Sequence, residues 1–387
     1  MSLRLYDRQR SVYAFLGGRL FAGTAAGAAT AEEGSTMRKL ALLTALLCAL
    51  AVAVGGGSAG NRHNGGGTVF ETERSLGSVS AFDAATGEVL WSSKTGLSPI
   101  GVTRPRGTEK VYTSDEGSNQ MSVFDEETGT LLTTIPMGAG PHHQMASRNG
   151  KRIYVGEFFQ NTVGVVDTRS DTEIANWVAN PDPLARTHAV FITRNGKDLY
   201  ATDTRLDRTQ PGDVAHLDAR TGERLCNIMV GADPSEILVR PNGKIGYVSV
   251  RRENKIKELD LRGDCPRLTG REAVIGTMPD TLHLTHDGRT LIVTLRGVPA
   301  QISYLDTETF AVQIVDIPGH VTTGHHWLSG DDRYTYVASE TPGSLSVVDN
   351  ETRAVVADYA YPTPGGVRPH GVFFVRDVLK DEDSEDD

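Results

Sequence analysis

The stretch NGKRIYVGEFFQNTVGVVD, residues 149–167, carries the pattern that decides the fold of this chain. It opens with Asn149-Gly150, the strongest short signal for a β-hairpin, because both central residues of the tightest hairpin turns must accept positive φ. Two apolar runs follow, separated by a short polar segment, and the second run ends at Asp167. The stretch therefore predicts a turn and two short antiparallel strands.

The same pattern recurs through most of the chain. Seven short apolar runs end in an aspartate, at separations of 42, 42, 51, 42, 46 and 43 residues. These aspartates are Asp83, Asp125, Asp167, Asp218, Asp260, Asp306 and Asp349. In five of the units an aromatic residue stands 13 residues earlier: Phe70, Tyr112, Tyr154, Tyr247 and Tyr336. Repeats of this length, each reading as four strands, are typical of the blades of a β-propeller.

The two ends of the repeat region complement each other. In the third unit, four strands are expected at 142–147, 152–156, 162–167 and 173–179. The first unit supplies only its last three strands, at 68–70, 79–83 and 89–91. Residues 369–375 supply one unpaired first strand at the far end, and we expect it to complete the first blade. The chain is therefore predicted to be all-β, a closed seven-bladed propeller of four-stranded blades that leaves no long sheet edge exposed.

The strand Arg152-Ile153-Tyr154-Val155-Gly156 and its counterparts at 110–113 and 246–249 each follow a turn and precede a short polar loop. In this they resemble the YVTN-repeat propellers of the YncE-like family, over residues 68–375. The resemblance implies the fold and does not select a function, since one fold hosts many chemistries. Related propellers include lactonases that use histidine, glutamate and arginine on one face, and haem-binding nitrite reductases that use histidines at the channel mouth.

The N-terminal region is predicted to carry an export signal. An apolar segment at 40–54 follows Met37-Arg38-Lys39, which gives the charged, hydrophobic and small-residue zones of a secretory signal. It is too short to span a bilayer comfortably, so we expect no transmembrane anchor in the mature chain and an extracytoplasmic location, periplasmic or secreted. We expect residues 1–36 to be a mis-assigned extension; the alternative is that they form a long but genuine start of the leader. The expected segments after it are a signal peptide at 37–59, a Gly-rich linker at 60–67, the propeller at 68–376 and an acidic disordered tail at 377–387.

Charge and cysteine content narrow the function classes. The formal net charge is -10, and the sequence has no cluster of basic residues that could bind phosphate groups. We therefore expect no nucleic-acid partner. Export would leave Cys226 and Cys265, which lie on consecutive repeats, in an oxidising compartment where a disulfide is permitted. Their spacing alone does not decide whether they pair. A closed ring of this size needs no partner for its stability, so a monomer is expected.

Histidines concentrate at one place in the repeat. Seven of the eleven fall in the short segments that enter the first strand of five units: His142, His143, His188, His283, His325, His326 and His370. Because those segments converge on one mouth of the channel, they indicate a site for a transition metal, copper, iron or zinc, with neutral imidazole as the ligand. Haem is the less favoured cofactor, because the chain lacks a Cys-x-x-Cys-His motif. The alternative is that each histidine only caps its own turn.

Two further expectations concern the same mouth. Neighbouring residues on a strand point to opposite faces, so only one histidine of each doubled pair is expected to face the channel. The loops after the second strands add five candidate ligand-binding residues: Asp115, Asp203, Arg251, Arg296 and Glu340. Carboxylates on one side and arginines on the other would orient an anionic or zwitterionic ligand. The alternative is an ordinary solvated rim.

The sequence leaves two functions open. The favoured one is a non-catalytic module that binds a small molecule, a metal ion or another exported protein at the histidine-rich mouth. The other is an enzyme, either a lactonase-like hydrolase or a metal-dependent oxidoreductase, with the catalytic candidates His142, His188, Glu157 and Glu236. Glu236 stands in its unit where His143 stands in the third, and a histidine and a glutamate that face each other can do acid–base work.

Overall fold

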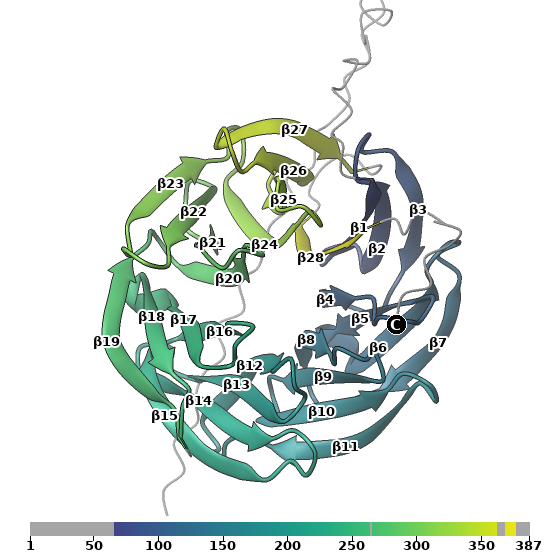
Figure 1. Cartoon of the computed structure of the whole chain (residues 1–387). Helices are drawn as coiled ribbons and strands as arrows, with labels where there is room; N and C mark the ends of the chain where they lie inside the picture. The colour runs from purple at the N-terminus through teal and green to yellow at the C-terminus, as the bar shows by residue number, and fades with distance from the viewer. Residues whose placement is uncertain (1–65, 264, 362–367, 377–387) are drawn as a thin grey trace, which may run out of the picture. The chain divides into compact units, whose positions relative to one another are not determined.

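The computed structural model describes residues 66–263, 265–361 and 368–376 of the chain. In these ranges the chain forms 28 strands, β1 to β28, gathered into seven antiparallel sheets of four strands each. The sheets stand around a central opening, as Figure 1 shows. The predicted all-β, seven-bladed propeller is confirmed. The segments expected at 1–36, 37–59 and 377–387, and most of the linker, lie outside the described residues.

The first blade combines both ends of the repeat region. It comprises β28 (Pro369–Arg376), β1 (Gly67–Glu73), β2 (Ser78–Asp83) and β3 (Val89–Lys94). Blade 2 comprises β4 (Pro99–Thr103), β5 (Lys110–Asp115), β6 (Gln120–Asp125) and β7 (Leu131–Pro136). Blade 3 comprises β8 (Pro141–Ala146), β9 (Arg152–Glu157), β10 (Thr162–Asp167) and β11 (Thr172–Val178). In blade 3 the four predicted strands are present within two residues at each end.

The remaining blades follow the chain in order, with the first strand of each innermost. Blade 4 comprises β12 (Ala185–Ile192), β13 (Asp198–Arg205), β14 (Pro211–Asp218) and β15 (Arg224–Ala232). Blade 5 comprises β16 (Pro234–Val239), β17 (Ile245–Val250), β18 (Lys255–Asp260) and β19 (Arg267–Val274). Blade 6 comprises β20 (Pro279–Leu284), β21 (Thr290–Leu295), β22 (Gln301–Asp306) and β23 (Val312–Asp316). Blade 7 comprises β24 (Thr322–Leu328), β25 (Tyr334–Glu340), β26 (Ser344–Asp349) and β27 (Ala354–Ala360).

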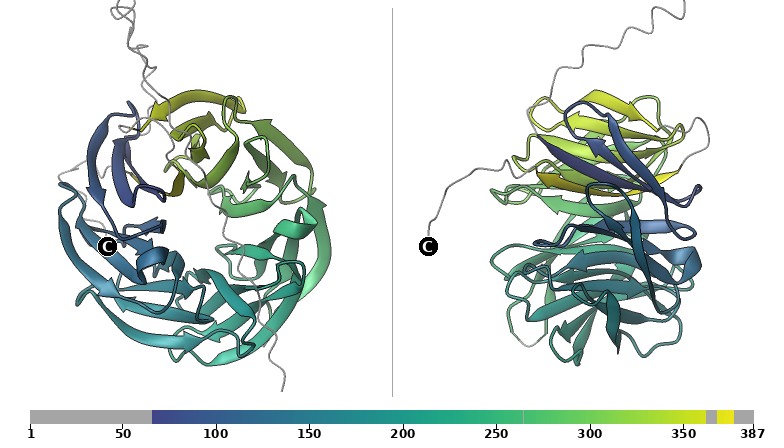
Figure 2. Two further views of the ribbon diagram at one scale, coloured as in Figure 1. Left: turned by 180° about the vertical axis from the view of Figure 1, so that it is seen from behind. Right: turned by 90° about the vertical axis from the view of Figure 1, so that its right-hand side faces the viewer.

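The ring closes where the sequence predicts. Strand β28 pairs with β1 in antiparallel register, with Phe374 opposite Val69 and Phe373 opposite Phe70. The yellow and purple ends of the described chain meet in this blade in Figures 1 and 2. Strand β1 is therefore paired on both sides, with β28 and with β2, and presents no free edge.

The repeated aromatic and aspartate residues have separate structural tasks. Tyr112, Tyr247 and Tyr336, on the second strands of their blades, are fully buried. The hydroxyl of Tyr336 donates a hydrogen bond of 3.3 Å to the carbonyl of Ala84, which links blade 7 to blade 1. Five of the seven repeated aspartates instead accept backbone N–H groups two and three residues later, an Asx turn that leads into the fourth strand. Such paired bonds occur at Asp83, Asp167, Asp218, Asp306 and Asp349.

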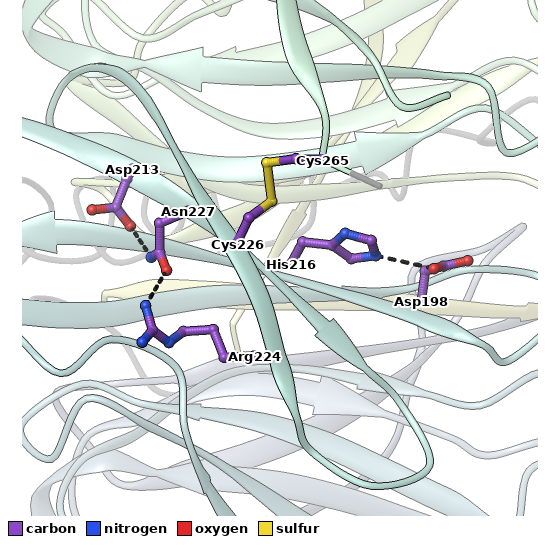
Figure 3. Close-up of a disulfide and its surroundings, with 7 residues drawn as sticks. All are labelled: Asp198, Asp213, His216, Arg224, Cys226, Asn227 and Cys265. Atoms are coloured by element: carbon purple, nitrogen blue, oxygen red, sulfur yellow. Dashed lines mark hydrogen bonds and ion pairs between the residues drawn. A yellow bond between two sulfur atoms is a disulfide. The ribbon is translucent and has the colours of Figure 1, made fainter. Parts of the chain in front are cut away.

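A disulfide joins two neighbouring blades. Cys226 of β15 and Cys265, which precedes β19, are bonded with a Cα–Cα distance of 6.0 Å (Figure 3). The pairing that the sequence leaves open is therefore present. Beside it, the Nε2 atom of His216 lies 3.0 Å from Asp198, so this histidine belongs to the body of blade 4 rather than to the channel.

Two short 3-10 helices follow the second strands of blades 2 and 5, η1 (Glu116–Ser118) and η2 (Arg251–Glu253). Backbone hydrogen bonds join them to the segments that enter the inner strands, Glu116 N–H to Ser98 at 3.2 Å and Arg251 N–H to Asp233 at 3.0 Å. We call the side of the ring that carries these segments the upper face. Within the described ranges, no helix has the length and the apolar character needed to cross a membrane.

Candidate functional site

Every inner strand carries an irregularity close to its start. In blade 3, Pro141 pairs with Glu157 and Gln144 pairs with Val155, so three steps along β8 match two along β9. Corresponding shifts occur between Pro99 and Val102, Thr187 and Ala189, Pro234 and Ile237, Pro279 and Leu282, Thr323 and His326, and Pro369 and Val372. An extra residue of this kind is a β-bulge, which bends the strand and re-aims its side chains.

Because of the bulge in β8, both histidines of this strand lie at the centre of the ring, which we call the hub. The imidazole rings of His142 and His143 are stacked, with centroids 4.7 Å apart and planes inclined by 2°. His188, in the bulge of β12, lies 4.4 Å from the first ring and 4.6 Å from the second. The expectation that only one histidine of a doubled pair faces the channel was wrong here, because the bulge breaks the alternation of faces along the strand.

Imidazoles continue across the hub. The ring of His143 lies 4.3 Å from that of His325, which lies 4.3 Å from that of His370. Strands β8 and β12 are on one side of the central opening in Figure 1, and β24 and β28 are on the other. The rings therefore bridge the opening between blades 3 and 4 and blades 7 and 1. We call the five buried residues His142, His143, His188, His325 and His370 the hub histidines.

Three hub histidines are close enough to share one ligand. His142, His143 and His188 each offer a ring nitrogen, and these nitrogens lie within 4.8 Å of one another. The Nδ1 atom of His188 also lies 2.9 Å from the backbone carbonyl oxygen of Ser235 in blade 5. Because a carbonyl only accepts, Nδ1 carries the proton of His188 and Nε2 keeps a free lone pair.

The hub histidines are uncharged at neutral pH. Burial lowers the pKa of His142, His188, His325 and His370 well below the ordinary value, and that of His143 to about 4. Neutral imidazole is the form that binds metal ions. The Nδ1 atom of His142 and the Nε2 atoms of His143 and His325 have no hydrogen-bond partner among the described residues. Buried polar atoms without a partner call for a ligand or an ordered water.

Charged side chains are paired behind the imidazoles. The Nη2 atom of Arg251 lies 2.5 Å from Asp280, and Nη1 of Arg296 lies 3.6 Å from the same carboxylate. Burial alone would raise the pKa of Asp280, but the two guanidinium groups outweigh it and hold that pKa far below its usual range. Arg296 also lies 3.0 Å from Glu340 and 3.2 Å from His370. Arg251, Arg296 and Glu340, which we expected to hold an anionic ligand, are therefore engaged within the protein.

Glu236 lies beside the hub histidines, in the bulge of β16. One of its carboxyl oxygens is 4.0 Å from Nδ1 of His143, and the other accepts the N–H of Leu282 at 2.5 Å. Burial raises the pKa of Glu236 to about 8, so this carboxyl group keeps a proton at pH 7. Glu236 in β16 and His143 in β8 each stand directly before the residue at which pairing with the second strand of the blade resumes. The two residues therefore occupy equivalent positions in their blades, as the repeat predicts.

The remaining predicted carboxylates hold connecting segments in place. Asp115 and Glu157 each accept a backbone N–H from the segment that enters an inner strand, at 2.9 and 2.7 Å. Asp203 accepts the hydroxyl of Thr187 at 2.8 Å. All three carboxylates are fully buried at the ends of second strands instead of lining an exposed rim. The structure therefore does not bring them together with the hub histidines.

Two of the predicted histidines form a separate pair further from the upper face. The ring of His283 lies 4.7 Å from that of His326 and 4.4 Å from that of Trp327. The Nδ1 atom of His326 lies 2.9 Å from the hydroxyl of Thr281. Neither histidine belongs to the group of three nitrogens described above.

Sequence reasoning missed Ser235 and Asp280, which support the site from blades 5 and 6. Each stands two residues before the point where pairing resumes, the position that His142 takes in blade 3. The available signal was the shared proline before them, in Pro234-Ser235-Glu236 and Pro279-Asp280-Thr281 as in Pro141-His142-His143. The hydroxyl of Ser235 donates to Asp280, so the two missed residues are themselves in contact.

The fold and the hub together define the class of this protein: a seven-bladed β-propeller with a row of uncharged histidines across its channel. The sequence model of one family, described as outer membrane protein assembly factor BamB, matches residues 75–243. No curated protein matches the chain by sequence.

Several solved structures share the fold at low identity. Hydrazine synthase from Kuenenia stuttgartiensis superposes with a TM-score of 0.65 and 18% identity, over 74% of this chain and 93% of that chain. The periplasmic gluconolactonase PpgL from Pseudomonas aeruginosa gives 0.61 and 18%, over 80% and 99%. The dihydro-haem d1 dehydrogenase NirN, in complex with DHE, gives 0.55 and 14%, over 79% and 75%. Identities this low establish the shared fold and no shared function.

Proposed function

We propose that this chain is a metal-binding propeller that holds a transition-metal ion at its hub, between His142, His143 and His188. The observation that carries the proposal is the approach of three buried ring nitrogens to within 4.8 Å of one another. Imidazole ligands suit copper, zinc and iron. A hard cation such as Ca²⁺ prefers oxygen ligands, which these three side chains do not offer. The general order of affinities for divalent ions makes Cu²⁺ the tightest expected occupant.

The surroundings of the three rings support the same proposal. Metal-ligating histidines usually donate their second ring N–H to a carbonyl or carboxylate, which fixes the orientation of the ring. His188 has such a partner in the carbonyl of Ser235 at 2.9 Å. The carboxyl group of Glu236 lies 4.0 Å from the Nδ1 atom of His143, which is near it but beyond hydrogen-bond distance. The ring of His325 lies 4.3 Å from that of His143, so His325 is the candidate for a fourth metal ligand.

We further propose that the protein is a YVTN-repeat propeller of the YncE-like family and that it is exported beyond the cytoplasm. In this proposal the protein is a monomer, and a small molecule or another exported protein is its second partner. The disulfide between Cys226 and Cys265 supports an oxidising compartment. The match to an outer membrane protein assembly factor and the fold shared with a periplasmic gluconolactonase support the same location.

Metal analysis of protein purified without a histidine tag tests the hub site. Wild-type protein is expected to bind one Cu²⁺ or Zn²⁺ ion per chain, measured by titration and by elemental analysis. The double variant His142→Ala/His188→Ala should bind at least about 100-fold more weakly, since it keeps one of the three donors. His283→Ala is the matched control, a half-buried histidine outside the group, and should bind as the wild type does. Full binding by the folded double variant, or none by the wild type, would refute the proposal.

One second function is favoured by a specific contact, the hydrolysis of a lactone at the hub. Glu236, with its raised pKa of about 8, supplies a protonated carboxyl group 4.0 Å from the neutral imidazole of His143. An acid and a base in such proximity can share the proton transfers of ester cleavage, a contribution of about 100-fold or more in rate. Hydrolysis of gluconolactone that falls about 100-fold in Glu236→Gln would support this function. A wild-type protein without gluconolactone turnover would remove it.

A further inference from the structure

A cavity of about 240 Å³ lies on the propeller axis, next to the hub histidines and on their side away from the upper face. All seven inner strands contribute to its wall, from Gly101–Val102 of β4 to Gly371–Val372 of β28. We call it the axial chamber. His143, Glu236 and His325 belong both to the hub and to the chamber wall, so the two are adjacent.

Most of the chamber wall is apolar. Valine, isoleucine and leucine side chains of five inner strands form it, together with the rings of Phe191 and Trp327. The ring of Trp327 is held between two others, 4.4 Å from Phe373 and 4.4 Å from His283. Fixed aromatic rings pack best against another flat ring, edge to face or offset. The wall therefore favours an aromatic occupant.

The chamber also contains polar atoms without a partner. The side-chain amide nitrogen of Gln144 donates to the carbonyl of Tyr112 at 2.7 Å. Its Oε1 atom is buried and has no hydrogen-bond partner among the described residues, and the same holds for Nδ1 of His283 and Nε2 of His326. A buried acceptor that is left without a donor destabilises the protein, because it has lost its hydrogen bonds to water. The carbonyl of Gln144 therefore calls for an occupant that donates a hydrogen bond.

The chamber wall offers no strong cation to an occupant. Among the residues that line it there is no lysine or arginine. Its one carboxyl group, that of Glu236, already accepts the N–H of Leu282. An anionic occupant would lose its hydration without gaining a lysine or arginine partner, which is costly. The chamber therefore selects against an anion.

We propose that the axial chamber binds a phenol, an uncharged single-ring aromatic molecule whose hydroxyl group donates to Gln144 while its ring packs against Trp327 and Phe191. An apolar cavity of about 150 Å³ accepts benzene. A cavity of about 240 Å³ leaves room for a substituted ring and is below the usual size of sites for larger ligands. The inference goes beyond the proposed metal site and needs no metal, because none of these three residues belongs to the group of three histidines.

Calorimetric titration of the metal-free full chain tests this inference with three probes of similar size. 4-Methylphenol should bind, anisole, which lacks a donor, should bind about 10-fold more weakly, and benzoate, which is charged, should not bind. Gln144→Leu removes the acceptor at nearly constant size, so it should bring 4-methylphenol and anisole to within about twofold of each other. Gln301→Leu, in β22 and outside the chamber, is the matched control and should keep the wild-type preference.

A second variant tests the location of the site. Leu282→Phe fills the chamber from blade 6, which supplies none of the three grouped histidines, and should abolish binding of both neutral probes. Wild-type protein that fails to bind 4-methylphenol, or binds anisole equally well, overturns the inference. Metal content measured on the same preparations keeps the two proposals separate. Protein that binds metal and no phenol contradicts the chamber alone, and protein that binds phenol and no metal contradicts the hub site alone.

Discussion

The Nη2 atom of Arg251 lies 2.5 Å from Oδ1 of Asp280, and the two side chains are 8% and 0% exposed. Arg251 belongs to η2 of blade 5, and Asp280 belongs to the inner strand of blade 6. The hydroxyl of Ser235 also donates to Asp280. The pair therefore joins two blades directly behind the hub, where a lone charge would have no access to water.

Arg251→Ala is expected to destabilise the protein by about 3–5 kcal/mol, because it leaves a buried carboxylate with only Arg296 nearby. The double variant Arg251→Met/Asp280→Asn removes both charges and should recover at least half of that loss. Urea unfolding measures both changes. Lys255→Ala breaks a surface pair with Glu272 and serves as the control, with an expected loss below about 1 kcal/mol. If Arg251→Ala loses no more than this control, the buried pair does not stabilise the fold.

The fold could be predicted because its signals are local. The repeated aspartates accept backbone hydrogen bonds within their own turns, so their spacing records the position of each hairpin directly. The closing strand was predictable for a different reason. A unit that lacks its first strand and a lone strand at 369–375 complete each other, and β28 begins at Pro369 as predicted.

The site was only partly predictable, because its geometry depends on strand register. The sequence places seven histidines at one end of the inner strands, but the grouping of His142 with His143 arises from the bulge between β8 and β9. Residue types do not encode that shift. Asp203 was predicted as a ligand-binding residue and Glu157 as a catalytic candidate, and both roles require access from the channel mouth. They are buried because a backbone N–H and a hydroxyl of the entering segments satisfy them.

Asp203→Asn should make the stability of the protein less dependent on pH. Burial, and then the nearby carboxylate of Asp213, raise the pKa of Asp203 to about 8, whereas an aspartate in the unfolded chain titrates near about 3.9. The folded state therefore binds more protons between about pH 4 and pH 8, and stability falls as pH rises through this window. The variant lacks this loss, so its stability relative to the wild type should rise by on the order of 4 kcal/mol from pH 5 to pH 8.

Thermal unfolding at pH 5, 6.5 and 8 measures this difference. The exposed Asp316 provides the control, and Asp316→Asn should follow the wild type at each pH. A difference between Asp203→Asn and the wild type that stays constant from pH 5 to pH 8 would contradict the raised pKa.

Loss of the disulfide should lower the free energy of unfolding by about 2–4 kcal/mol, because the bond between Cys226 and Cys265 constrains the unfolded chain over a separation of 39 residues. The double variant Cys226→Ala/Cys265→Ala is expected to unfold at a lower temperature than the wild type. A reducing agent should bring the wild type down to the same midpoint and leave the variant unchanged. A wild-type midpoint that does not respond to reduction would show that the bond contributes nothing to stability.

Phe374→Ala should weaken the closure of the ring. Phe374 is 7% exposed, pairs across β28 and β1 with Val69, and stacks on Tyr336 of blade 7 with centroids 5.6 Å apart. Its ring thus contacts the blades on both sides of the closing point, and truncation of a buried phenylalanine costs about 3–5 kcal/mol. Phe159→Ala is the control, since Phe159 is 58% exposed and a surface change costs about 0.5 kcal/mol or less.

Hydrogen exchange locates the effect along the chain. Amide protons of residues 67–73 in β1 should exchange faster in Phe374→Ala than those of the second strands of blades 3 to 5, because detachment of β28 frees one edge of β1 and leaves those blades intact. A freed edge also invites pairing between chains, so the variant should associate at high concentration. If exchange rises equally in all blades, Phe374 stabilises the ring as a whole and the closing strand is not its weakest point.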